Sequence, residues 1–193
     1  ETYIFPFVFP KLIWFRAMTL LLAGCYAVLL STDWKKYAPK FNGLTISIVL
    51  FTLSWIISTY VGVDVHRSVW DGHERMLGLF TFFHYIIFFF VLSATIRNQK
   101  DWRNLVRVFL GIGVVVMCIA VIQRFNPDFL YNNGGGRVTG TLGNPIYLGA
   151  FAFFVSCMGA WLAMSATEKW EKIFGYGSIV LGLLGIVYSE SRG

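Results

Sequence analysis

The stretch of the sequence best suited to chemistry is GGGRVTGTLGNP, which carries one arginine among glycines and leads into a long apolar run. Arg137 offers a permanently charged, planar guanidinium that suits two-pronged binding of carboxylate or phosphate. Gly140 and Gly143 let backbone amides approach a ligand closely, as in other glycine-rich anion sites. Asn144 followed by Pro145 predicts a helix start, because asparagine caps free N–H groups and proline loses no hydrogen bond there.

Together, the arginine, the glycines and the positive end of a helix dipole predict a site suited to phosphate or diphosphate. The alternative for the same stretch is a plain flexible connection.

Histidines and cysteines are the remaining candidates for chemistry. His66 and His73 stand beside acidic residues at a spacing that matches no metal-ligand pattern, so we expect no metal and no cofactor. His84 lies inside an apolar run, where an ionisable side chain is a functional candidate. The alternative is a neutral histidine hydrogen-bonded to a neighbouring helix. The three cysteines lie in apolar runs and suggest neither a disulfide framework nor a zinc site: Cys25, Cys118 and Cys157.

The composition is that of a membrane protein. Of 193 residues, 56% are hydrophobic and only 13% are charged, and the mean hydropathy is +0.64. A soluble domain carries about 25% charged residues, so too few remain here to cover a water-exposed surface. The net charge of +6 does not indicate nucleic-acid binding, because the basic residues lie between apolar segments, where they act as topology signals.

We therefore predict an all-α integral membrane protein, a polytopic helix bundle in a single domain. Crossing a bilayer takes about 20 mostly apolar residues. The predicted spans are residues 12–30, 44–61, 76–96, 105–122, 145–165 and 173–188, and residues 123–144 form an external loop. The start at Glu1 and the end at SESRG suggest a piece of a longer protein.

Lysine placement predicts the orientation of these spans. The connections around residues 35–40, 97–107 and 169–172 hold every lysine except Lys11 and are expected to be cytoplasmic. The GGGRVTGTLGNP loop then lies on the external, periplasmic face of a bacterial inner (plasma) membrane.

Several arginines collect on this predicted external face, which the positive-inside rule disfavours unless they are needed. Besides Arg137 they are Arg67, Arg75, Arg124 and Arg192. Their alternative role is contact with lipid headgroups and pairing with nearby carboxylates, namely Asp64, Asp71, Glu74 and Glu190.

Three segments carry a resemblance to a known family. RVTGTLGNPIYLGAFAFF resembles the R-x-x-G-T-x-G-N-P-N-x-L-A/G segment of the bacterial O-antigen ligase and O-antigen polymerase superfamily. SVWDGHERMLGLFTFFHY is similar to an upstream segment of the same proteins, and SESRG is similar to their S-x-S-R-G-A element. The three matches occur in order and lie between residues 68 and 193.

The resemblance implies a C-type glycosyltransferase fold and a metal-independent enzyme. Such an enzyme moves a glycan from an undecaprenyl-diphosphate carrier to a lipid or glycan acceptor at the outer membrane face. By the same resemblance, Arg137 and Arg192 match diphosphate-binding positions, and Arg75 matches an earlier arginine of the family. Gly140, Gly143 and Asn144 complete the expected diphosphate site.

The chain departs from the family at two points. Ile146 stands where the family often has asparagine. The family's external loop with the acceptor-activating histidine is expected after Gly193, so no catalytic residue is assigned. Two other functions stay open: a small-anion transporter of the same superfamily, which needs polar groups at mid-membrane, and a non-catalytic membrane scaffold.

Overall fold

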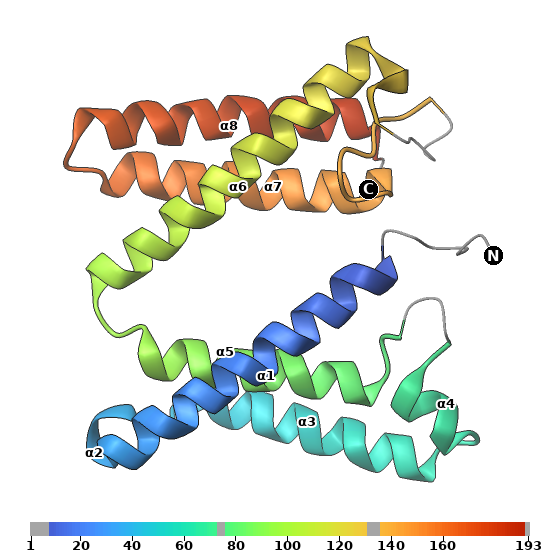
Figure 1. Ribbon diagram of the computed structural model, residues 1–193, viewed down its shortest axis with the longest axis vertical. Coiled ribbons are helices and arrows are strands. Elements are labelled where there is room, and N and C mark those ends of the chain that lie inside the picture. The colour runs from blue at the N-terminus through green and yellow to red at the C-terminus, as the bar shows by residue number, and fades with distance from the viewer. Residues whose placement is uncertain (1–7, 73–75, 131–135, 192–193) are drawn as a thin grey trace. The chain divides into compact units, whose positions relative to one another are not determined.

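The computed structural model describes residues 8–72, 76–130 and 136–191, and all regular structure in these ranges is helical (Figure 1). The helices form two compact units, Glu1–Arg97 and Asn98–Gly193. The first unit contains α1 (Val8–Thr32), α2 (Trp34–Tyr37), α3 (Gly43–Val61), α4 (Val65–Trp70) and α5 (Leu79–Thr95). The second contains α6 (Gln99–Phe125), the 3₁₀ turn η1 (Pro127–Phe129), α7 (Pro145–Ser165) and α8 (Lys169–Ser189).

Five helices in the described ranges are long and apolar enough to cross a membrane. They are α1 from Phe9, α3, α6, α7 and α8. This composition and length define a multi-pass helical membrane architecture, as the sequence predicts.

The predicted span 76–96 is shorter in the structure, because α5 covers only Leu79–Thr95, which is 17 residues. Residues 76–78 are not helical, and Gly78 lies against α4. Met76 has a left-handed backbone (φ 50°), and the Asp71 carboxylate accepts a hydrogen bond from the Leu77 amide at 3.1 Å. Gly78 lies so close to α4 that a Cβ there would be 2.3 Å from the Val69 carbonyl oxygen.

Helix α6 is longer than the predicted span 105–122, with 27 residues. Both extensions carry polar side chains that are used inside the second unit. Arg103 and Gln123 each hydrogen-bond to groups more than one helical turn away in the chain. Gln123 and Arg124, expected in the external loop, therefore lie in the last turns of a helix.

Burial in the first unit follows the pattern of a membrane protein. Its buried side chains include several polar ones, namely Thr19, Thr45, Thr52, Thr59, Thr81 and His84. Large apolar side chains face outward instead, with Leu21 62% exposed and Val61 82% exposed. In lipid, apolar side chains gain nothing from mutual burial, so small and polar residues line the helix contacts.

Helices α7 and α8 lie side by side in the second unit, and α6 crosses both (Figure 1). The core includes apolar side chains with no exposed surface, among them Leu110, Met117 and Leu148. Glycines bring the two backbones together: a Cβ on Gly159 would lie 2.8 Å from the Gly175 carbonyl oxygen. Such small-residue contacts are typical of helix pairs in membranes.

A buried carboxylate joins the three helices at one end of this unit. Glu171, in the first turn of α8, has a fully buried side chain that forms salt bridges with Arg103 and Arg107 of α6. Arg103 also donates to the Ser165 carbonyl at the end of α7 at 2.8 Å. This cluster fixes the end of the unit that lies away from the glycine-rich loop.

Candidate anion site at the start of α7

Helix α7 begins where the sequence predicts. Asn144 is its N-cap, and the Asn144 side-chain oxygen accepts a hydrogen bond from the Ile146 amide at 2.8 Å. Pro145 occupies the first turn, where its missing N–H breaks no helical hydrogen bond. The positive end of the α7 dipole therefore lies at the glycine-rich loop, where it favours an anion by about 0.3–1 kcal/mol. Ile146, at the family's asparagine position, is 61% exposed beside this end.

Two glycines shape the loop through their backbone angles. Gly140 has φ 55° and Gly143 has φ 76°, in the left-handed region that favours glycine. A hydrogen bond from the Leu142 amide to the Thr139 carbonyl at 3.2 Å closes the turn between them.

The Gly140 amide is already used inside the protein. It donates to the Gln123 side-chain oxygen at 2.8 Å, and the residue is buried. Its role in the structure is to form the turn, and its own N–H does not point to a ligand.

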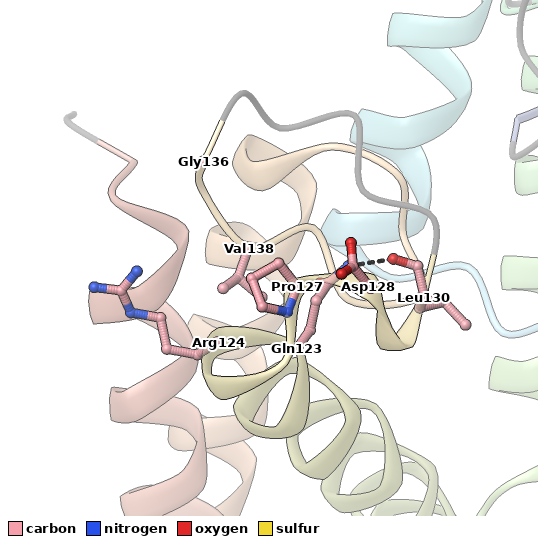
Figure 2. Close-up of a pocket in the computed structure, with 7 residues that line it drawn as sticks. All are labelled: Gln123, Arg124, Pro127, Asp128, Leu130, Gly136 and Val138. Atoms are coloured by element: carbon pink, nitrogen blue, oxygen red, sulfur yellow. Dashed lines mark hydrogen bonds between the residues drawn. The ribbon is translucent and has the colours of Figure 1, made fainter.

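Gln123 is a residue that the sequence patterns did not single out. Its side chain, 1% exposed, accepts hydrogen bonds from the Thr139 and Gly140 amides and donates to the Leu130 carbonyl at 3.3 Å (Figure 2). The only sequence signal is a single carboxamide at the end of an apolar run, where a polar side chain needs a partner.

The SES part of the SESRG element lies against the first turns of α7. The Ser191 hydroxyl donates to the Pro145 carbonyl at 3.0 Å, across 46 positions in the sequence. Gly149 permits this approach, because a Cβ there would lie 2.9 Å from the Ser189 hydroxyl oxygen. At the end of α8, the Tyr188 carbonyl accepts a hydrogen bond from the Val138 amide at 3.3 Å.

Of the three predicted binding arginines, Arg137 lies in the described part of the chain. Arg137 is exposed and directly precedes Val138, which is buried. Arg192 and Arg75 lie outside the described residues, although Arg192 directly follows Ser191 in the chain. Three segments thus meet at one end of the second unit. They are the loop residue after Arg137, the start of α7, and Ser191, the residue before Arg192.

A cavity of about 510 Å³ lies beside the loop, between the end of α6, η1 and Gly136 (Figure 2). Its lining includes Arg124 and Asp128, which are both exposed. Figure 2 shows the Arg124 side chain extending away from Asp128, and its guanidinium lies 6.0 Å from the centre of the Tyr188 ring. The volume falls within the range of small-molecule pockets, about 300–1,000 Å³.

His84 is buried in the first unit and bonds within its own helix, whereas the sequence alternative was a bond to a neighbouring helix. Its Nδ1 lies 2.8 Å from the Phe80 carbonyl oxygen. A carbonyl only accepts, so this contact places the ring proton on Nδ1. The buried Nε2 has no partner among the described residues.

Arg16 is a second residue that the sequence patterns did not single out. From α1 it donates to the Met76 carbonyl at 3.0 Å and to the Thr81 hydroxyl, and it lies 5.0 Å from the centre of the Phe80 ring. It therefore ties α1 to the start of α5.

Comparisons with protein families, with curated proteins and with solved structures found no match to this chain. The class that the structure itself defines is a multi-pass helical membrane protein. At one end of its second unit, a glycine-rich loop leads into the N-terminus of α7.

Proposed function

We propose that this chain forms the carrier-binding part of a membrane glycosyltransferase. The enzyme moves a glycan from an undecaprenyl-diphosphate carrier to a lipid or glycan acceptor at the outer membrane face, as O-antigen ligases and polymerases do. The bound group is the diphosphate, and the proposed ligands are Arg137, Arg192 and the start of α7 around Gly143 and Asn144. Arg75 remains a prediction of the family resemblance alone and is not placed with these ligands.

The observation that carries this proposal is the hydrogen bond between Ser191 and Pro145. It joins two of the three segments that resemble the family, although they lie 46 residues apart. The Val138–Tyr188 hydrogen bond supports the same arrangement from the loop side. An anion at this end of the unit would lie near two positive groups, the dipole end of α7 and Arg137.

The proposed chemistry is electrostatic. Breaking the glycan–phosphate bond leaves negative charge on the diphosphate, and positioned cations stabilise that charge in the transition state. Arginine stays protonated, so it holds the leaving group and transfers no proton. No step in this scheme requires a metal.

The first prediction tests diphosphate binding by native mass spectrometry of the purified complete protein with undecaprenyl diphosphate. Arg137→Ala and Arg192→Ala should each weaken binding about 10- to 100-fold, because hydrogen bonds to charged groups contribute about 1.5–3 kcal/mol. Arg97→Ala removes the same charge at the predicted cytoplasmic side and should bind like the wild type. Failure of the wild type to bind, or equal binding by all variants, would rule out this site.

One observation favours the alternative function, small-anion transport. In the first unit, Arg16 of α1 contacts Thr81 of α5. One helical turn further along each helix lies another buried polar side chain, Thr19 on α1 and His84 on α5. A transporter needs such polar groups within the membrane. Anion flux into liposomes that contain the purified protein, lost in Arg16→Leu, would support transport over glycan transfer.

A further inference from the structure

The amide side chain of Gln123, on α6, binds the chain on both sides of the glycine-rich loop, at Leu130 before it and at Thr139 and Gly140 after it. Its oxygen accepts from two backbone amides, Thr139 at 3.2 Å and Gly140 at 2.8 Å, which uses both lone pairs. Its nitrogen donates to the Leu130 carbonyl, on the α6 side of the loop. The side chain is 1% exposed, so water does not replace these bonds easily.

A second anchor holds the same short segment from the other side. The Val138 amide donates to the Tyr188 carbonyl of α8 at 3.3 Å. Three consecutive amides, from Val138 to Gly140, are therefore bound to α6 or α8. Val138 and Thr139 are buried with exposures of 2% and 0%. The segment is therefore held through its own backbone amides, independently of its own side chains.

Arg137 is the residue directly before this anchored segment. Its own side chain is exposed, and the anchored backbone sets the point from which this side chain extends. Removing the Gln123 contacts would free two of the three bound amides. The Val138–Tyr188 hydrogen bond would remain as the single one of the three, so the backbone that carries Arg137 would be held less firmly.

We infer that Gln123 is a positioning residue for the anion site, which acts on the diphosphate only through the backbone that carries Arg137. This inference rests on the proposed function for the identity of the ligand. Gln123 is uncharged, its oxygen accepts from two loop amides and its nitrogen donates to the Leu130 carbonyl, so its role is assigned to the loop backbone and not to the ligand.

The test is a double-mutant cycle in the complete protein with undecaprenyl diphosphate as the probe. Gln123→Met keeps the length of the side chain and removes its hydrogen bonds. We expect it to weaken binding about tenfold, within the range of coupling energies measured for interacting residues. In an Arg137→Ala background, Gln123→Met should cause no further loss, because the residue acts through Arg137. Gln99→Met, at the exposed start of the same helix, is the matched control and should bind normally.

Two binding results would overturn the inference while leaving the proposed function intact. One is unchanged affinity in Gln123→Met. The other is a loss that adds fully to that of Arg137→Ala, which would show that Gln123 acts independently of the arginine.

A second measurement needs no ligand and separates the inference from the proposed function. Hydrogen exchange of the peptide that contains residues 138–142 should be faster in Gln123→Met than in the wild type or in Gln99→Met. Equal exchange in Gln123→Met and the wild type would overturn the inference whether or not diphosphate binds. If Gln123→Met cannot be purified, slow exchange that persists in Gln123→Ala would overturn it equally.

Discussion

At the scale of single residues, the glycine-rich loop divides its work between backbone geometry and charge. Gly140 and Gly143 adopt left-handed backbone angles. Gln123 of α6 accepts hydrogen bonds from the loop amides of Thr139 and Gly140. Arg137 remains exposed and available. The composition of the loop predicts an anion site, but the division of roles follows from the contacts, since the buried Gly140 amide is directed at a side chain of the protein itself.

Gly140→Ala should destabilise the protein by about 1–3 kcal/mol, because a residue with a Cβ is strained in this backbone region. The added Cβ would also lie 3.2 Å from Leu148 Cδ1 in the core. Thermal unfolding in detergent measures the effect. Gly111→Ala in α6 is the control, since its Cβ meets nothing within 4 Å. Alanine there should leave stability unchanged or raise it by about 0.5–1 kcal/mol.

At the scale of helices, α6 is held to α7 and α8 by different chemistry at its two ends. Near its start, Arg103 and Arg107 bind the buried Glu171 carboxylate. Near its end, Gln123 binds the loop that leads to α7. Between these points the contacts are apolar, with Leu110 and Met117 fully buried. Polar contacts at both ends explain why α6 extends beyond its apolar stretch.

Glu171→Gln should lower stability by about 3 kcal/mol, because breaking a buried ion pair leaves the remaining charges without a partner. The arginine side chains keep partial access to solvent, at 22% and 31% exposure, which limits the loss. Glu168→Gln is the matched control, since this carboxylate lies exposed one turn earlier. A melting temperature of Glu171→Gln equal to that of the control would contradict a structural role for the cluster.

At the scale of the whole chain, each end of the second unit has its own chemistry. The end of α6, the start of α7 and the end of α8 meet at the glycine-rich loop, whereas their opposite ends meet at Glu171. If the lysines mark the cytoplasmic side, the loop faces outward and Glu171 lies at the inner surface. The exposed apolar side chains between the two ends then face lipid.

This orientation can be measured by cysteine labelling in intact cells, in a background where the native cysteines are replaced by serine or alanine. Asp128→Cys, on the exposed η1 turn, should react with a membrane-impermeant maleimide added outside. Lys172→Cys, at the exposed start of α8, should react only after permeabilisation. The opposite pattern would invert the assigned topology and remove the loop from the external face.

The sequence alone determined the helical membrane class, most of the helices and the start of α7. Long apolar runs leave a chain few alternatives to membrane helices, and the Asn144–Pro145 cap acts within one helical turn. The sequence also predicted a span at residues 76–96 that is longer than the observed helix α5. Residues 76–78 lie outside the helix because Gly78 packs against α4, which the local sequence does not reveal.

Only the tertiary structure decided which distant residues meet. Ser191 reaches Pro145 across 46 positions, and Glu171 reaches Arg107 across 64. Gln123 meets Gly140 because α6 crosses the α7–α8 pair at that end. Local propensity and hydrophobic periodicity describe one helix at a time, whereas these contacts depend on how three helices pack. The physical reason is the close approach that Gly149, Gly159 and Gly175 permit, which places the helix ends and therefore the candidate site.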